Sequence, residues 1–191
     1  EPIMNSTVIY GQSLALLTDL YQLTMAYGYW KSGQADRRAA FHLFYRKQPF
    51  GSGFSIACGL SAMIDFIERF RYDASDLAYL ETLTGADDKP LFERAFLDYL
   101  GQLQFSGDIA AVPEGTAVFP RQPLVRVTAP LLECQLLETP LLTMVNFATL
   151  IATKAARIYL ASEGGAVIEF GLRRAQGIDG GVPAARAAYV G

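Results

Sequence analysis

Near the end of the chain, two arginines and an acid follow a short apolar run, and these are the residue types of an anion-binding site. The run at 165–170 is small and apolar, and Arg173, Arg174 and Asp179 come directly after it. We predict that 165–170 is a buried parallel strand, because ligands of α/β folds bind beyond the carboxyl ends of such strands. Planar guanidinium groups pair well with phosphate or carboxylate. Arg173 and Arg174 are therefore predicted to hold an anion; the alternative is that both are solvated loop charges.

Composition predicts a folded protein without an overall positive field. The chain has 191 residues, of which 51% are hydrophobic and 18% charged, and its formal net charge is -3. A negative net charge does not recruit nucleic acid or anionic membranes, so we expect neither as a partner. The longest apolar stretch, 141–151, contains Asn146 and falls short of the roughly 20 residues of a spanning helix.

Two cysteines, Cys58 and Cys134, lie in apolar sequence. This pattern favours reduced core thiols in a cytoplasmic protein over a disulfide framework. The sequence has no CxxC and no cluster of histidine and cysteine, so no structural zinc site is expected and no residue is assigned as a metal ligand.

Periodicity and turn residues outline helices and strands along the whole chain. We predict helices at 20–31, 60–70, 75–83, 89–103, 131–145 and 148–162. We predict strands at 39–46, 109–112, 117–119, 124–128 and 165–170. The three strands between 109 and 128 are separated by Pro and Gly turns and are expected to form a small antiparallel unit.

An aromatic face is predicted on the first of these helices. Thr18 and Asp19 precede it as capping residues, and Tyr21, Met25 and Tyr29 recur on one side. Aromatic residues at helical spacing usually pack into a core, so the residues alone assign Tyr21 to the buried face.

Four stretches together resemble the nicotinate phosphoribosyltransferase family, which joins nicotinic acid to a phosphoribosyl group. They are Leu-Thr-Asp-Leu-Tyr-Gln-Leu-Thr-Met at 17–25, the segment 44–51 with Phe-Tyr-Arg-Lys and Pro-Phe-Gly, the segment 136–157, and Glu169 to Gly181. They stand in the order and at the spacing of the family. The resemblance covers essentially the whole chain.

The resemblance implies an α/β fold class. An α+β, sandwich-like N-terminal domain would occupy 1–130, and 131–191 would hold the first helices and βα unit of an irregular, TIM-like barrel. A TIM barrel takes roughly 250 residues. The chain is therefore expected to be an N-terminal fragment with an incomplete barrel.

The resemblance also implies which residues bind the flat nicotinate ring. In the family two aromatic side chains grip the ring, and they match Tyr21 and Phe170 of this sequence. Related enzymes take these two residues from different subunits, which implies a homodimer with shared active sites. Stacking on both faces would contribute on the order of 1–3 kcal/mol.

Phosphate-binding roles are implied for the arginines. By resemblance Arg173, with Arg174 beside it, contacts the phosphoribosyl donor, and Arg46 reaches its pyrophosphate from the neighbouring subunit. The alternative for Arg46 is an exposed charge at a strand end. Asp179 either holds ribose hydroxyls or metal, or caps a Gly-rich turn, and both possibilities stay open. Lys154 and Arg157 lie one turn apart, where a solvated helix face is favoured over a phosphate role.

The implied reaction converts nicotinate and 5-phosphoribosyl 1-diphosphate to nicotinate mononucleotide and diphosphate, with ATP hydrolysis and Mg²⁺, in NAD salvage. The family uses a phosphorylated histidine in a barrel loop beyond this chain. His42, the single histidine, lies in a predicted strand and matches no such loop. The catalytic residues are therefore unknown, and the chain alone is expected to be inactive.

Three alternatives to a nicotinate phosphoribosyltransferase remain, two of them related enzymes and one a protein without catalytic activity. One is the nicotinamide-using relative, which shares the Phe-Gly-x-Arg core; Arg174 and the following Arg-Ala-Gln-Gly-x-Asp-Gly favour the nicotinate enzyme. Another is a truncated, non-catalytic paralogue that acts as a binding module. A quinolinate-decarboxylating relative is least favoured, because that group uses a more basic site.

Overall fold

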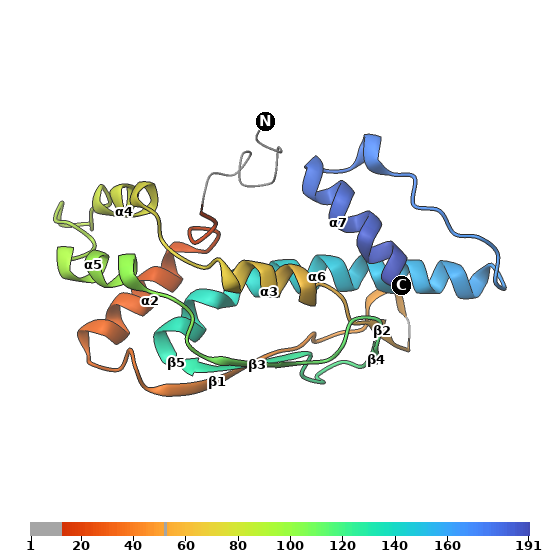
Figure 1. Cartoon of the computed structure of the whole chain (residues 1–191), viewed down its shortest axis with the longest axis horizontal. Helices are drawn as coiled ribbons and strands as arrows, with labels where there is room; N and C mark the ends of the chain where they lie inside the picture. Colours follow the sequence, from red (N-terminus) through yellow and green to blue (C-terminus); the bar gives the residue numbers. More distant parts are fainter. Residues whose placement is uncertain (1–12, 52) are drawn as a thin grey trace. The chain divides into compact units, whose positions relative to one another are not determined.

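The computed structural model describes residues 13–51 and 53–191, with the Asp179 side chain also outside the description. Three consecutive helices, within 60–102, are followed by three short strands, within 108–130, and then by one long helix (Figure 1). The chain divides into two compact units. The first holds residues up to Ala40 with Ile64–Asp108 and Thr128–Pro140, and the second holds Phe41–Met63, Ile109–Val127 and Leu141–Gly191.

Helix α2 (Leu20–Lys31) has the predicted bounds. Asp19 is its N-cap residue by backbone geometry, although its side chain makes no capping hydrogen bond. The helix ends at Lys31 with Ser32 as its C-cap, and Gly33 follows with φ +68°, a conformation that favours glycine.

The assignment of Tyr21 to the buried face of α2, made from helical spacing alone, is wrong. Tyr21 is 50% exposed and Met25 41% exposed, whereas Gln22, Leu23 and Ala26 are buried. The buried side of α2 is instead formed by Gln22, Leu23 and Ala26. The helical spacing of Tyr21 therefore did not indicate that it is buried.

The first unit has an aromatic core. Helices α4 (Ala74–Glu81) and α5 (Arg94–Gln102) pack against each other in this unit. Asp73 caps α4 in a capping box with Asp76. The rings form a contact cluster with centroids 5.0–6.5 Å apart, in which Phe96 is fully buried; its members are Tyr27, Trp30, Phe92, Phe96 and Tyr99.

The strands form two sheets instead of the single antiparallel unit that was predicted. β1 (Arg38–Leu43), β5 (Val125–Pro130) and β3 (Asp108–Ala111) form one sheet in the order β1-β5-β3. β4 (Ala117–Val118) pairs antiparallel with β2 (Ser55–Ile56) in the other. β4 departs because the turn at 113–116 brings it to β2, where Ala57 donates its N–H to the Thr116 carbonyl.

Helix α6 (Leu131–Ala161) is continuous over 31 residues and joins the two predicted helical stretches. Pro140 lies inside it. Among the described residues α6 is the one helix whose length and mean hydropathy, 1.4, would suffice to cross a membrane, but half of its most apolar window is buried. Such burial is typical of a core helix.

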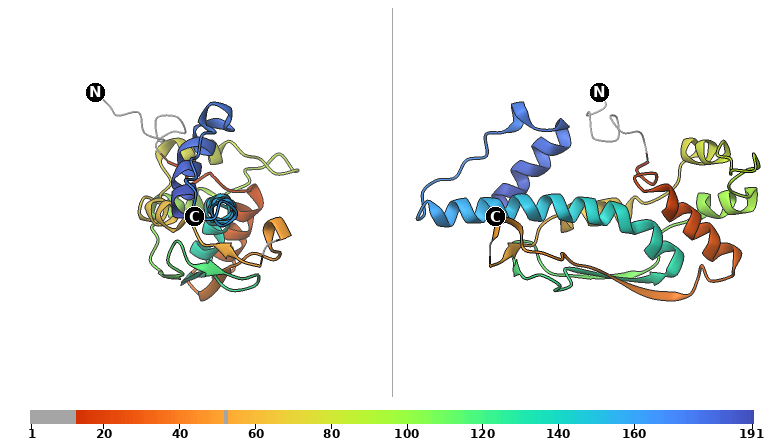
Figure 2. Two further views of the ribbon diagram at one scale, coloured as in Figure 1. Left: turned by 90° about the vertical axis from the view of Figure 1, so that its right-hand side faces the viewer. Right: turned by 180° about the vertical axis from the view of Figure 1, so that it is seen from behind.

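The predicted parallel strand at 165–170 is wrong. The segment between α6 and α7 (Gly177–Val190) is an irregular loop with one short 3₁₀ turn, η2 (Leu172–Arg174) (Figure 2). Ile168 is 79% exposed within it. A parallel strand needs hydrogen-bonded neighbours, and no described strand pairs with this segment.

Alanines form the contact between α7 and the second half of α6. Ala148, Ala152 and Ala156 recur every four residues on α6 and share one buried cluster with Ala187 of α7. Phe54, Ile151 and Val190 pack against its edge. Small side chains let the two helix backbones approach closely, so α7 is held despite the irregular loop before it.

We predict that Phe96→Ala destabilises the first unit by about 3–5 kcal/mol, because it removes a fully buried ring from the aromatic cluster. Urea denaturation followed by fluorescence measures this, since the single tryptophan, Trp30, contacts Phe96. Tyr79→Ala is the control, because Tyr79 is 57% exposed. Equal denaturation midpoints for the two variants would contradict the assigned core.

Candidate functional site

Tyr21 presents half of its surface to solvent from the first turn of α2, in the first unit. Its hydroxyl accepts a hydrogen bond from Gln22 Nε2 at 2.7 Å. The pKa of Tyr21 is raised by partial loss of water around the hydroxyl and by the negative charges of Glu138 and Asp19. The polar end of the side chain is thus bound to the protein, while the ring stays accessible.

A buried polar network lies behind Tyr21. Gln22 is 0% exposed, and its amide also donates to Thr139 Oγ1 at 3.5 Å. Gln135 of α6 donates its Nε2 hydrogen to Gln22 Oε1. Thr139 in turn donates to Asp19 Oδ2 at 3.2 Å. Sequence reasoning missed Gln22 and Gln135. The available signal was that Gln22 shares a helix face with the apolar residues Leu23 and Ala26.

Arg46 lines a cavity of about 520 Å³ in the second unit. Most of its walls are apolar side chains from the end of β1, the 44–49 loop and α6. Lys47 also lines it, and Asn146 and Thr143 face it from α6. The arginine is exposed, as is Lys47, so the cavity combines apolar walls with two cationic side chains.

The loop that carries Arg46 is held by hydrogen bonds on both sides of it. Tyr45 donates its hydroxyl to the Val118 carbonyl at 2.7 Å and accepts at its backbone carbonyl from Arg121 N–H. Gln48 donates to Ser55 Oγ at 3.0 Å. Arg46 therefore projects from a fixed backbone and is not at a free strand end.

Phe170 and Arg173 lie together on the loop before α7. Phe170 is 74% exposed, and the Arg173 guanidinium carbon lies 5.0 Å from its ring centroid, a cation–π contact. Arg174 is exposed in the same 3₁₀ turn. Neither arginine forms an ion pair with a described carboxylate. Both remain available for an anion.

The structure brings some predicted site residues together and leaves others apart. Phe170, Arg173 and Arg174 share one loop, whereas the cavity around Arg46 is lined by none of them. Asp179 belongs to α7, but its side chain lies outside the described residues. Tyr21 belongs to the first unit and the others to the second.

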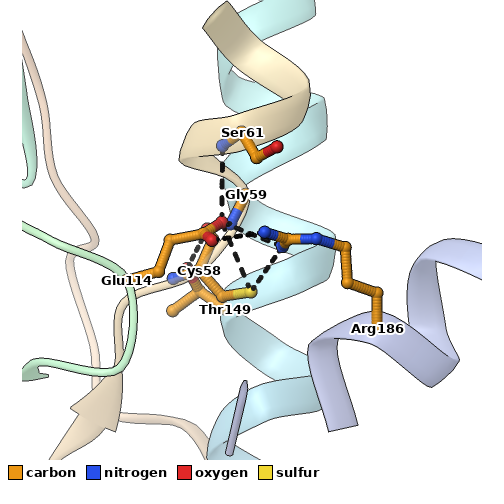
Figure 3. A network of polar contacts seen from close by, with 6 residues as sticks. All are labelled: Cys58, Gly59, Ser61, Glu114, Thr149 and Arg186. Carbon is orange, nitrogen blue, oxygen red and sulfur yellow. Dashed lines mark hydrogen bonds and ion pairs between the residues drawn. The ribbon is translucent and has the colours of Figure 1, made fainter. Parts of the chain in front are cut away.

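A polar network fastens α7, the helix that follows the arginine loop (Figure 3). Arg186 of α7 binds Glu114 through two contacts, 3.1 and 2.6 Å long. The same carboxylate accepts from the N–H groups of Gly59, at 2.8 Å, and Ser61, at 3.4 Å, where α3 (Leu60–Glu68) begins. These interactions hold the pKa of Glu114 at about 2, and the ion pair with Arg186 is the largest cause.

Gly59 is required for this network. Its φ is +102°, and an added Cβ would lie 2.8 Å from the Met144 carbonyl oxygen and 2.9 Å from the Val145 Cα. Only glycine allows the chain to pass so close to α6 while directing its N–H to Glu114.

The cysteines behave as predicted, and both are free and buried. Burial raises the pKa of the Cys58 and Cys134 thiols, which keeps them protonated and unreactive. Among the described residues no group of three or more His, Cys, Asp or Glu side chains is arranged to hold a metal ion. His42 lies exposed in β1.

Comparisons with known proteins point to one family. Residues 16–146 match the model of the nicotinate phosphoribosyltransferase (NAPRTase) N-terminal domain. Among curated relatives, the nicotinate phosphoribosyltransferase of Dictyostelium discoideum is 47% identical over 92% of this chain and 29% of its own length. The protein of the same name from Bos taurus is 48% identical over 92% of this chain and 32% of its own.

Solved structures agree with the sequence matches. The human nicotinic acid phosphoribosyltransferase superposes with a TM-score of 0.80 and 45% identity over 90% of this chain and 34% of that one. The nicotinate-nucleotide pyrophosphorylase of Pyrococcus furiosus has a TM-score of 0.69 at 20% identity, over 99% and 38%, which shows a shared fold alone. This chain spans about a third of the length of these relatives.

We predict that Glu114→Gln destabilises the second unit by about 2 kcal/mol at pH 7, less than the full pKa displacement implies because Arg186 is half exposed. The folded-state pKa lies below the ordinary value of 4.5. The stabilisation is therefore fully present above that value and is lost as the pH falls toward about 2. Urea denaturation followed by circular dichroism at pH 7, 4 and 3 measures it.

The control for this prediction is Asp65→Asn, which removes an exposed pair with Arg69 and should cost less than about 0.5 kcal/mol. An equal loss of stability with acidification in wild type and Glu114→Gln would refute the role of the ion pair.

Proposed function

Because this chain belongs to the nicotinate phosphoribosyltransferase family, we propose that it contributes to an enzyme that joins nicotinate to 5-phosphoribosyl 1-diphosphate. The products would be nicotinate mononucleotide and diphosphate. The observation that carries this proposal is the family match over residues 16–146, and the 45% identity to the human structure supports it.

Two exposed aromatic rings support a site for a flat ring. Large aromatic side chains are usually buried, yet Tyr21 is 50% and Phe170 74% exposed. In this proposal the nicotinate ring stacks between a Tyr21 and a Phe170, drawn from different subunits of a homodimer. The rings then hold the base nitrogen in line with the anomeric carbon of the sugar.

Exposed arginines would bind the phosphate groups of the donor. Departure of diphosphate leaves a flat, cationic sugar, so the site must hold several phosphate oxygens while charge separates. Arg173 and Arg174 would contact the phosphoribosyl group, and Arg46 the diphosphate of a neighbouring subunit's site. Asp179 is proposed to bind the ribose hydroxyls. The cation–π contact positions Arg173 beside the ring that would stack on nicotinate.

Among the described residues no group of three or more His, Cys, Asp or Glu side chains is placed to hold a metal ion. We propose that Mg²⁺ enters with the diphosphate and ATP, which supply the oxygen ligands that it prefers. ATP coupling, a cytoplasmic location and a role in NAD salvage complete the proposal.

The test of the proposed function is nucleotide formation by the complete natural gene product that contains this chain. Nicotinate, phosphoribosyl diphosphate and Mg²⁺ are supplied with and without ATP, and products are separated by chromatography. We expect nicotinate mononucleotide, and an equimolar competition should favour nicotinate over nicotinamide. Exclusive use of nicotinamide, or no nucleotide at all, would overturn the proposal.

We predict that Phe170→Ala raises the KM for nicotinate by about tenfold, because it removes one stacking face. Steady-state kinetics at saturating phosphoribosyl diphosphate measure this. Ile168→Ala is the matched control, since Ile168 is as exposed and lies in the same loop. A similar KM for both variants would argue against stacking on Phe170.

We predict that Arg46→Ala raises the KM for phosphoribosyl diphosphate about tenfold or more while the KM for nicotinate changes little, because a charged hydrogen bond to phosphate is lost. Arg126→Ala on β5 is the control, an exposed arginine outside the cavity. If the KM for nicotinate rises instead, Arg46 does not bind the diphosphate.

A further inference from the structure

Gln22 is a polar side chain where packing alone would favour an apolar one. It is 0% exposed and stands beside buried Leu23 on the inner face of α2. Methionine would fill nearly the same volume without the cost of removing an amide from water. The glutamine is therefore best explained by its hydrogen bonds.

The hydrogen bonds of Gln22 form a chain with one direction. Gln135, itself 3% exposed, donates to the Gln22 carbonyl oxygen. The Gln22 amide then donates to the Tyr21 hydroxyl at 2.7 Å. The Tyr21 oxygen is therefore held as an acceptor of this amide hydrogen. Gln135 thus orients the Gln22 amide, and the Gln22 amide in turn orients the Tyr21 hydroxyl.

These hydrogen bonds hold the hydroxyl of Tyr21, while half of the residue's surface stays exposed. A tyrosine on the first turn of a helix would otherwise exchange between rotamers. Ordering an aromatic ring before the ligand arrives removes part of the entropy cost of binding. The hydroxyl is bound to Gln22, and the exposed part of the side chain is left for a ligand.

We propose that Gln22, supported by Gln135, is a positioning residue that holds the Tyr21 ring in place to stack on a flat aromatic acid. This inference rests on the proposed function. It adds that the affinity for the ring depends on an amide that never touches the substrate.

The test is a double-mutant cycle between Gln22→Met and Tyr21→Phe in the complete natural gene product. Each single variant breaks the same hydrogen bond, so each should raise the KM for nicotinate about three- to tenfold with kcat within about twofold. The double variant should be no worse than the poorer single variant, because the bond is already absent. The KM for phosphoribosyl diphosphate should not change.

Gln135→Met is a second variant that leaves α2 intact and should reproduce the rise in KM for nicotinate. It decides the question if Gln22→Met does not fold. The control is Glu133→Gln, which alters another buried polar contact of α6, to Ser106, and should lower the melting temperature without changing the KM for nicotinate.

Multiplicative effects of Gln22→Met and Tyr21→Phe would overturn the inference, and so would an unchanged KM in Gln22→Met or, if that variant does not fold, in Gln135→Met. In each of these cases an active wild type leaves the proposed function standing. No nucleotide formation by the wild type would overturn the proposed function, and this inference with it.

Discussion

Backbone N–H groups of β2 and of the residues after it find hydrogen-bond partners on helix α6. β2 has β4 along one edge, and its other edge is met by threonines: Thr153 Oγ1 accepts from Ile56 N–H at 2.9 Å and Thr149 Oγ1 from Cys58 N–H at 3.2 Å. An unpaired N–H buried there would cost about 1–3 kcal/mol. Thr153 is completely buried and donates its own hydrogen to the Thr149 carbonyl at 2.6 Å, so each polar atom has a partner.

The candidate site depends on this anchoring. Ser55 of β2 accepts from Gln48 at 3.0 Å, and Gln48 Oε1 lies 3.1 Å from the Tyr45 hydroxyl oxygen. Arg46 follows Tyr45, so its backbone position is traced through three side chains to a strand that α6 holds. In the first unit α6 has the same role, because Gln135 supports Gln22. One helix therefore supplies the fixed groups behind both the cationic and the aromatic candidates.

Much of the helical structure was predictable because local rules determine it. The bounds of α2 follow from Asp19 and Gly33, and α6 follows from a long apolar run after Pro130. The face of α2 was not predictable, since the burial of Gln22 depends on a glutamine 113 residues later. The 165–170 run has the composition of a buried strand, but composition does not supply the neighbours that a strand requires.

The aromatic candidates Tyr21 and Phe170 were identified through the family resemblance, whereas the position of Arg173 and Arg174 after an apolar run already predicted anion binding. Tyr21 and Phe170 are of residue types that usually lie in a core, and only their exposure in the structure distinguishes them from core residues. Gln22 and Gln135 carry no motif of their own. Their role emerges from hydrogen-bond direction, which a sequence does not encode in any short pattern.

The alanine contact between α6 and α7 tolerates few substitutions, whereas the exposed loop between these helices tolerates many. Ala148, Ala152 and Ala187 are buried in one cluster, so a larger side chain at any of them would overpack the contact between the helices. The loop from 162 to 176 begins and ends on helices that this contact holds, and its own residues are mostly exposed. Loop residues and even loop length can therefore diverge while the scaffold is inherited unchanged. Substitutions from Phe170 to Arg174 can therefore change the exposed surface of this loop without disturbing the packing of α7 on α6.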